Sequence, residues 1–220
     1  MALFEASGAD ALLVGSSFTL GDRLAAVVAA AKKGSSLPVI LFPGSAHQVC
    51  SEADGILFLT LLSGRNPLYL AEEQVRSAPR VREFGLEAIP TAYLLIGCGG
   101  RRTVHFVSGT EPIPEDRPEI AMAHALAAEY MGMHLVYLEA GSGADHPVPP
   151  SLIRSVADYV SLPLMVGGGI RSPEEARMAR EAGAQFVVIG HALEREPSGD
   201  LARAFADAIH GERVVARSGG

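Results

Sequence analysis

Seven short apolar runs alternate along the chain with segments of helical pattern. The runs lack polar alternation, so each is expected to be a strand buried on both faces, as in a parallel sheet. They cover Ala11–Val14, Val39–Phe42, Ile56–Leu59, Ala92–Ile96, Leu135–Leu138, Leu164–Val166 and Phe186–Ile189. The helical segments between them cover Arg23–Lys32, Ala71–Ser77, Ile120–Tyr130, Leu152–Tyr159 and Pro173–Ala182. This alternation predicts an α/β fold, a barrel of the TIM (β/α)8 type.

The strand count falls one short of the eight that a closed barrel of this type needs. Glu5–Asp10 leads into the first strand much as Glu181–Gln185 leads into the last, so Met1–Ser7 is expected to end a helix. We therefore expect a single barrel domain over residues 1–220, N-terminally truncated and lacking the first β-strand, with a flexible tail at about 211–220. Arg101–Phe106 is expected to add a hairpin strand outside the barrel.

Charge and composition narrow the classes of partner. The net charge of −7 makes non-specific binding to nucleic acid or to an anionic membrane surface unfavourable. The sequence has no run of about 20 apolar residues, which a membrane-spanning helix requires. The two cysteines, Cys50 and Cys98, match neither a disulfide framework nor a zinc-binding spacing. We interpret them as reduced thiols of a cytoplasmic protein.

Two glycine-rich turns follow successive strands near the C-terminus. The first contains Gly167, Gly168 and Gly169, and the second contains Gly190 followed by His191. Backbone N–H groups in such turns can approach an anion closely, and the last two loops of this barrel type commonly bind phosphate. A tight turn without a ligand is the alternative for the first loop. His191 either donates to a phosphate oxygen or caps the following helix.

A third loop, Tyr137–Ala144, follows the strand Leu135–Leu138. A phosphate is expected at the N–H groups and hydroxyl of Gly141, Ser142 and Gly143. Glu139 is expected to accept hydrogen bonds from substrate hydroxyls or to act as a general base. The alternative is a glycine turn with a surface glutamate.

Weaker candidates lie earlier in the chain. Arg65, with Asn66, follows the strand Ile56–Leu59 and is a candidate clamp for a diphosphate, or else an exposed loop arginine. Ser17 follows the first strand and offers a hydroxyl to Mg²⁺, or else is a turn residue. The other histidines show no metal-ligand spacing and are interpreted as surface or packing residues: His47, His105, His124, His134, His146 and His210.

Taken together, these motifs resemble the geranylgeranylglyceryl phosphate synthase family, which includes bacterial heptaprenylglyceryl phosphate synthases. Tyr137–Ala144 and the Leu-Leu-Ser-Gly-Arg-Asn-Pro within Leu57–Pro67 are the specific matches. The other matching segments are Val39–Ser45, Pro112–Pro114, Val166–Ile170 and Val188–His191. Their order and approximate spacing match over nearly the whole chain.

The resemblance implies a Mg²⁺-dependent prenyltransferase of phospholipid biosynthesis. The enzyme would transfer a polyprenyl group from its diphosphate to the C3 hydroxyl of sn-glycerol 1-phosphate, with Glu139 as the catalytic residue. Ser17 would stand where the family has a metal-linked Ser or Thr, and a dimer or higher homo-oligomer is expected. Glycerol phosphate would contact Tyr137, Leu138, Glu139, Ala140, Gly141, Ser142, Gly143, Gly168, Gly169, Gly190 and His191.

Two departures from the family pattern qualify this expectation. His191 stands where the family usually has Asn. The family's first strand ends in an Asp-Pro-Asp-Lys-like motif whose Asp binds Mg²⁺, and that strand is the one expected before Met1. The sequence does not give the length of the prenyl chain.

Two other functions stay open at this point. One is a different phosphate-binding barrel enzyme, an isomerase or aldolase, although the only lysines for Schiff-base chemistry, Lys32 and Lys33, lie on a helix. The other is a degenerate, non-catalytic barrel that binds a phosphometabolite. The missing strand favours this second alternative, whereas Glu139 and the glycine loops oppose it.

Overall fold

The computed structural model describes residues 5–19, 21, 23–195 and 197–211. Within them, seven strands pair side by side in the order β1-β2-β3-β4-β6-β7-β8, and every pair is parallel. A short β5 pairs in parallel with the end of β4. The strands are β1 (Leu12–Val14), β2 (Val39–Leu41), β3 (Gly55–Thr60), β4 (Glu87–Gly97), β5 (Ile113–Pro114), β6 (Leu135–Glu139), β7 (Leu164–Gly167) and β8 (Phe186–Val188).

The sheet curls but does not close. Among the described residues β1 and β8 are its two edges, with no pairing between them. The predicted α/β barrel one strand short of closure is thus confirmed, and all seven predicted strands are present. Of the predicted helix end at Met1–Ser7, only Glu5 and Ala6 are seen to be helical, because Met1–Phe4 lie outside the described residues. The predicted tail lies outside them too, apart from Gly211.

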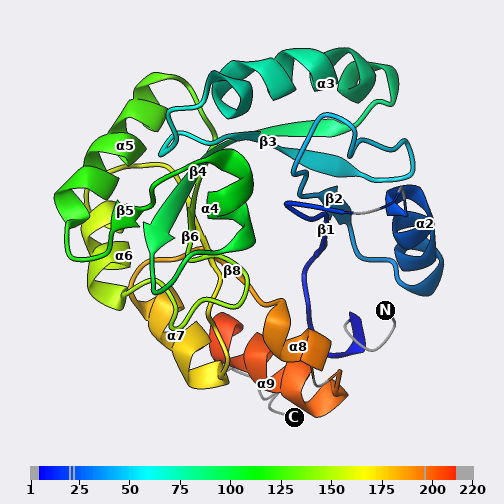
Figure 1. Cartoon of the computed structure of the whole chain (residues 1–220). Coiled ribbons are helices and arrows are strands. Elements are labelled where there is room, and N and C mark those ends of the chain that lie inside the picture. Colours follow the sequence, from blue (N-terminus) through cyan, green and yellow to red (C-terminus); the bar gives the residue numbers. More distant parts are fainter. Residues whose placement is uncertain (1–4, 20, 22, 196, 212–220) are drawn as a thin grey trace, which may run out of the picture.

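Helices form an outer ring around the strands, and α4 lies inside this ring (Figure 1). One apolar layer fills the space between the sheet and α5, α6 and α7, and a second lines the interior of the curled sheet. The helical elements are α2 (Leu24–Gly34), the π-helical turn η1 (Leu68–Glu72), α3 (Glu73–Glu83), α4 (Thr103–Ser108), α5 (Pro118–Tyr130), α6 (Pro150–Ala157), α7 (Pro173–Glu181), α8 (His191–Arg195) and α9 (Gly199–His210). No described helix is both long enough and apolar enough to cross a membrane.

Consecutive residues of β6 face these two different layers. Val136 and Leu138 pack in the outer layer against the helices. Leu135 and Tyr137 pack in the interior layer, and Glu139 lines the interior cavity. This is the period-two alternation of a strand, and it places the two polar residues of the motif inside the sheet.

The start of α7 is encoded locally. The Ser172 hydroxyl accepts a hydrogen bond from the backbone N–H of Glu175 at 3.3 Å, and Glu175 Oε2 accepts from the N–H of Ser172 at 3.1 Å. Pro173 occupies the first helical turn, where its missing N–H costs nothing. These contacts form a capping box and fix where the chain leaves the glycine turn after β7.

We expect Ser172→Ala to lower the free energy of unfolding by about 1 kcal/mol, because it leaves a first-turn N–H without its acceptor. Urea denaturation followed by circular dichroism measures the change. Ser151→Ala is the matched control, since Ser151 stands in the first turn of α6 and its hydroxyl makes no hydrogen bond to any described residue. Equal losses in the two variants would contradict the assignment of the cap.

The strand predicted at Arg101–Phe106 is wrong, because residues 103–108 form helix α4. The β-branched Thr103, Val104 and Val107 favour a strand in isolation, yet both ends of the helix are capped. The N–H of Arg102 donates to His105 Nδ1 at 3.3 Å, and Gly109 ends the helix in the left-handed conformation at φ 65°. The actual addition to β4 is β5, which pairs with Ile96 and Gly97.

Candidate active site

A cavity of about 1760 Å³ occupies the interior of the curled sheet. The loops that follow β1, β6, β7 and β8 contribute to its wall, so segments far apart in the sequence meet at one opening. Most of the predicted site residues line this cavity. They are Ser17, Tyr137, Glu139, Gly141, Ser142, Gly143, Gly168, Gly169, Gly190 and His191.

Glu139 is the one carboxylate among the predicted site residues, and its side chain is 5% exposed. Its Oε1 accepts a hydrogen bond from the N–H of Gly141 at 2.7 Å. Burial raises the pKa of Glu139, while the hydrogen bonds from the Tyr137 hydroxyl and from Gly141 oppose that rise. A buried carboxylate with a raised pKa is a stronger base than an exposed one, which suits it to accept a proton.

Several backbone N–H groups of the cavity wall have no acceptor among the described residues. Donors of this kind in a concave wall form a binding site for an anion. They come from three different loops, each of which follows a strand. The unpaired N–H groups belong to Ser142, Gly143, Gly168, Gly169 and Gly190.

Gly168 holds two of these loops in contact. Its φ of +80° lies in the left-handed region, and a Cβ at this position would stand 2.5 Å from Glu139 Oε1 and 2.6 Å from the Gly141 nitrogen. No side chain fits at those distances. Glycine is therefore required for the loop after β7 to lie against the carboxylate of β6.

Three of the predicted site residues do not present their side chains to the cavity. Leu138 and Ala140 pack in the layer under the helices, so only their backbone can reach a ligand. Arg65 is exposed, and its guanidinium donates to the carbonyl oxygens of Ser63 and Gly64 at 3.3 and 2.8 Å. The structure thus does not bring the Arg65 side chain to the cavity wall.

A cation that the sequence reasoning missed is Arg102, at the start of α4. Its side chain lines the cavity, lies against Gly141 and pairs with Asp145 Oδ1 at 2.7 Å. The Arg102 guanidinium lowers the pKa of Asp145. The Nε of Arg102 is buried and has no hydrogen-bond partner. In the sequence, Arg101 and Arg102 follow a glycine turn. That segment was predicted to be a hairpin strand outside the barrel, so Arg102 was not expected at the site.

The remaining candidates, His191 and Ser17, lie at the cavity rim. His191 is the first residue of α8 and is exposed. Two N–H groups of α8 donate to the carbonyl of Gly190, so it is Gly190 that precedes the helix as its cap. Ser17 lies beside Gly44, where a Cβ would stand 2.9 Å from the Cα of Ser17.

The deeper part of the cavity is apolar and aromatic. The rings of Phe42 and Tyr137 stack with centroids 5.3 Å apart, and Tyr93 meets both edge-on at 5.7 and 5.3 Å. Leu57, Leu59, Ile89 and Met165 continue this wall. The cavity therefore joins a rim that carries unpaired N–H groups to an apolar interior.

Comparison with known proteins agrees with this geometry. The geranylgeranylglyceryl phosphate synthase of Thermococcus gammatolerans is 50% identical over 200 residues, which are 90% of this chain and 79% of that protein. The protein of the same name from Chitinophaga pinensis is 44% identical over 210 residues, 96% of this chain and 82% of that one.

A solved structure carries the likeness into three dimensions. It is the (S)-3-O-geranylgeranylglyceryl phosphate synthase from Thermoplasma acidophilum in complex with its substrate sn-glycerol-1-phosphate. It superposes with a TM-score of 0.90 at 36% identity, covering 94% of this chain and 84% of that one. The model of the PcrB family matches residues 2–209. The chain therefore belongs to the PcrB family.

Proposed function

We propose that this protein is a prenyltransferase that joins a polyprenyl group to the C3 hydroxyl of sn-glycerol 1-phosphate through an ether bond. The observation that carries the proposal is the set of unpaired backbone N–H groups that line the same cavity as the buried carboxylate of Glu139. Such a rim fits a small phosphate monoester that also carries a hydroxyl group. Relatives named geranylgeranylglyceryl phosphate synthase, one solved with sn-glycerol-1-phosphate, support the same substrate.

The phosphate of this substrate would accept hydrogen bonds from the free N–H groups of the three glycine loops, while Glu139 accepts one from the C3 hydroxyl. In the reaction the C3 oxygen forms a bond to C1 of the prenyl chain. The bond between C1 and the diphosphate breaks, its electron pair leaves with the diphosphate, and the hydroxyl proton passes to Glu139. The hydrogen bonds from Tyr137 and Gly141 hold the carboxylate in place for that transfer.

The other substrate would place its chain in the apolar interior beside Phe42, Tyr93 and Tyr137. Positive charge develops on the allylic carbon as the diphosphate leaves, and aromatic faces stabilise a cation. Arg102 lines the cavity and lies against Gly141 in the loop after β6, and its Nε has no hydrogen-bond partner among the described residues. We therefore assign Arg102 to the phosphate groups at the rim.

Mg²⁺ dependence is part of the proposal, but the described residues supply only part of a site. Mg²⁺ is usually held by about one or two carboxylates together with substrate phosphates, and bound Mg²⁺ would neutralise the leaving diphosphate. Ser17 offers a hydroxyl at the rim. In the described part of the chain the only cluster of three or more Asp, Glu, His or Cys ligands is Cys98, Glu115 and His146, and none of these lines the cavity. The Ser17 side chain is thus no complete Mg²⁺ site, and no step above runs through the metal.

The two alternatives find less support. Lys32, one of the two lysines that Schiff-base chemistry would need, pairs with Asp54 at 2.6 Å and does not line the cavity. A non-catalytic barrel would have no need of a buried carboxylate at the anion rim. The cytoplasmic location and the homo-oligomer stay predictions of the sequence.

The direct test incubates the protein with sn-glycerol 1-phosphate, Mg²⁺ and radiolabelled prenyl diphosphates of several chain lengths. We expect an ether-linked, acid-stable lipid phosphate from at least one chain length. The enantiomer sn-glycerol 3-phosphate is the control and should react far more slowly. The proposal fails if no chain length gives an ether product.

The rim cation gives a separate prediction. We expect Arg102→Met to raise the KM for a phosphate-bearing substrate about 10- to 100-fold, because a hydrogen bond from a charged group contributes about 1.5–3 kcal/mol. Methionine keeps an apolar stem over Gly141. Arg101→Met, at the exposed neighbouring residue, is the control. Steady-state kinetics with each substrate varied in turn measures the effect, and an unchanged KM for both substrates would refute this role for Arg102.

A further inference from the structure

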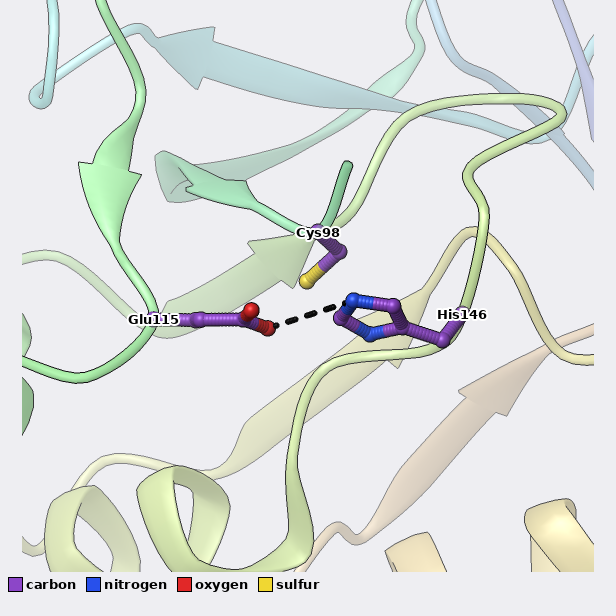
Figure 2. A group of neighbouring side chains, drawn as sticks. All are labelled: Cys98, Glu115 and His146. Atoms are coloured by element: carbon purple, nitrogen blue, oxygen red, sulfur yellow. Dashed lines mark ion pairs between the residues drawn. The ribbon is translucent and has the colours of Figure 1, made fainter. Parts of the chain in front are cut away.

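Three side chains with metal-binding groups meet on segments that are far apart in the sequence (Figure 2). Cys98 directly follows β4, Glu115 follows β5, and His146 lies in the loop between β6 and α6. One sulfur, one carboxylate oxygen and one imidazole nitrogen all lie within 4.8 Å of one another. Cys98 is buried, Glu115 is half-buried and His146 is exposed, so the cluster opens to solvent on one side.

The imidazole of His146 is held with its ligating nitrogen toward the cluster. Nδ1 lies 3.1 Å from the carbonyl oxygen of Pro147, and a carbonyl can only accept, so Nδ1 carries the hydrogen. In the neutral ring Nε2 then has a free lone pair, and it faces Glu115 Oε2 at 3.5 Å. Histidines that bind metals usually donate their other N–H to a carbonyl in this way.

The other two groups have few polar partners. Glu115 Oε2 is shielded from solvent and accepts no hydrogen bond, and its ion-pair partner is His146 Nε2 at 3.5 Å. Cys98 is 1% exposed and free of any disulfide. Buried polar atoms without hydrogen-bond partners are rare, and a bound ion is one of the usual reasons for them.

We propose that Cys98 Sγ, a Glu115 carboxylate oxygen and His146 Nε2 bind a divalent zinc-class transition metal, leaving a fourth position for water. Zinc–ligand bonds of about 2.0–2.3 Å place the ligands of a tetrahedral site about 3.5 Å apart. The His146–Glu115 pair already has this separation. The cysteine sulfur needs to approach by only about 1 Å to complete the set.

Ligand chemistry separates this site from the proposed magnesium function. Thiolate and imidazole favour zinc, cobalt and similar ions, whereas Mg²⁺ favours an all-oxygen shell. Burial and the charges of Glu115 and Glu139 raise the pKa of the Cys98 thiol to about 12. The same negative charges attract a divalent cation, which displaces the thiol proton on binding.

The location gives the site a structural consequence. His146 belongs to the same loop as Gly141–Gly143, and its carbonyl oxygen lies 2.3 Å from where a Cβ on Gly169 would stand. A metal bound here would tie the loop after β6 to the ends of β4 and β5. It would thus hold the Gly141–Gly143 segment of the cavity rim in place, independently of which ligand the rim binds.

Cobalt titration tests the site on the full chain, after removal of any histidine tag. We expect one Co²⁺ per chain, intense visible bands of a tetrahedral site and a near-ultraviolet thiolate-to-cobalt band, all displaced by Zn²⁺. Cys98→Ser should abolish the thiolate band. Cys50→Ser, which changes the other cysteine of the chain, should keep it.

The remaining ligands have their own variants, which keep the sulfur probe in place. His146→Asn and Glu115→Gln should each weaken cobalt binding by more than about 10-fold. His124→Asn, whose ring also donates to a carbonyl, should leave it unchanged. No thiolate band in the wild-type protein, a band that survives Cys98→Ser, or equal weakening by His124→Asn would each overturn the proposal.

Discussion

Glu139→Gln lowers kcat by about 10²–10⁴-fold if this carboxylate accepts the proton of the attacking hydroxyl. The amide keeps the shape of the side chain, and its oxygen can still accept from the N–H of Gly141. It cannot take up a proton. Single-turnover assays with prenyl diphosphate and glycerol 1-phosphate measure the loss, while direct binding of glycerol phosphate should change much less.

The pH dependence of activity and of stability gives two further readouts of the same residue. Because burial raises the pKa of Glu139 above its ordinary 4.5, kcat/KM should fall on acidification at a pH above that value.

Folding favours the protonated form, so the charged carboxylate costs stability as pH rises from 4.5 through the raised pKa. Glu139→Gln should therefore gain stability relative to wild type over that window. If Glu139→Gln kept the wild-type kcat, Glu139 would not be the proton acceptor of the reaction.

Gly168→Ala is expected to reduce kcat/KM by about 100-fold or more, since a misplacement of about 1 Å in a catalytic group costs that much. The added Cβ would overlap Glu139 Oε1 and the Gly141 nitrogen, at 2.5 and 2.6 Å. The carboxylate and the anion rim would both have to move. Steady-state kinetics and a thermal melt measure the two effects together.

Gly132→Ala separates the collision from the backbone strain. Gly132 has a similar φ of +73°, but nothing lies within 4 Å of its Cβ position. Both variants should lose about 1–2 kcal/mol of stability from the left-handed conformation. Only Gly168→Ala should lose activity as well. Equal activity in the two variants would mean that the contact between the glycine loop and Glu139 is not needed for catalysis.

The sheet and helices α2, α3, α5, α6 and α7 could be predicted because their signals are local, whereas α9 was not predicted. Continuous apolar runs identified each strand of the main sheet, and Ser172, Pro173 and Glu175 marked the start of α7. Helix α4 could not be found in this way. Its Thr and Val residues favour a strand, but the capping contacts at Arg102 and Gly109 stabilise the helix.

The candidate site was predictable where it follows strand ends. Tyr137, Glu139 and the glycine loops converge because parallel strands end at one edge of the sheet. Arg65 was predicted to reach a diphosphate, but its guanidinium donates to a carbonyl of its own loop. The sequence alone does not show which of these two partners an arginine takes. The cluster of Cys98, Glu115 and His146 matches no recognisable sequence motif, because its residues lie on three separate segments that come together only on folding.

The two faces of β6 separate what the strand contributes to stability from what it contributes to chemistry. Outward-facing Val136 and Leu138 respond to volume alone, so swaps among apolar side chains there change the melting temperature and leave the reaction intact. Inward-facing Tyr137 and Glu139 tolerate no such exchange. Inserting one residue before Val136 would turn each set toward the wrong layer. The insertion would therefore disrupt the packing of the outer apolar layer and also move Glu139 out of the cavity.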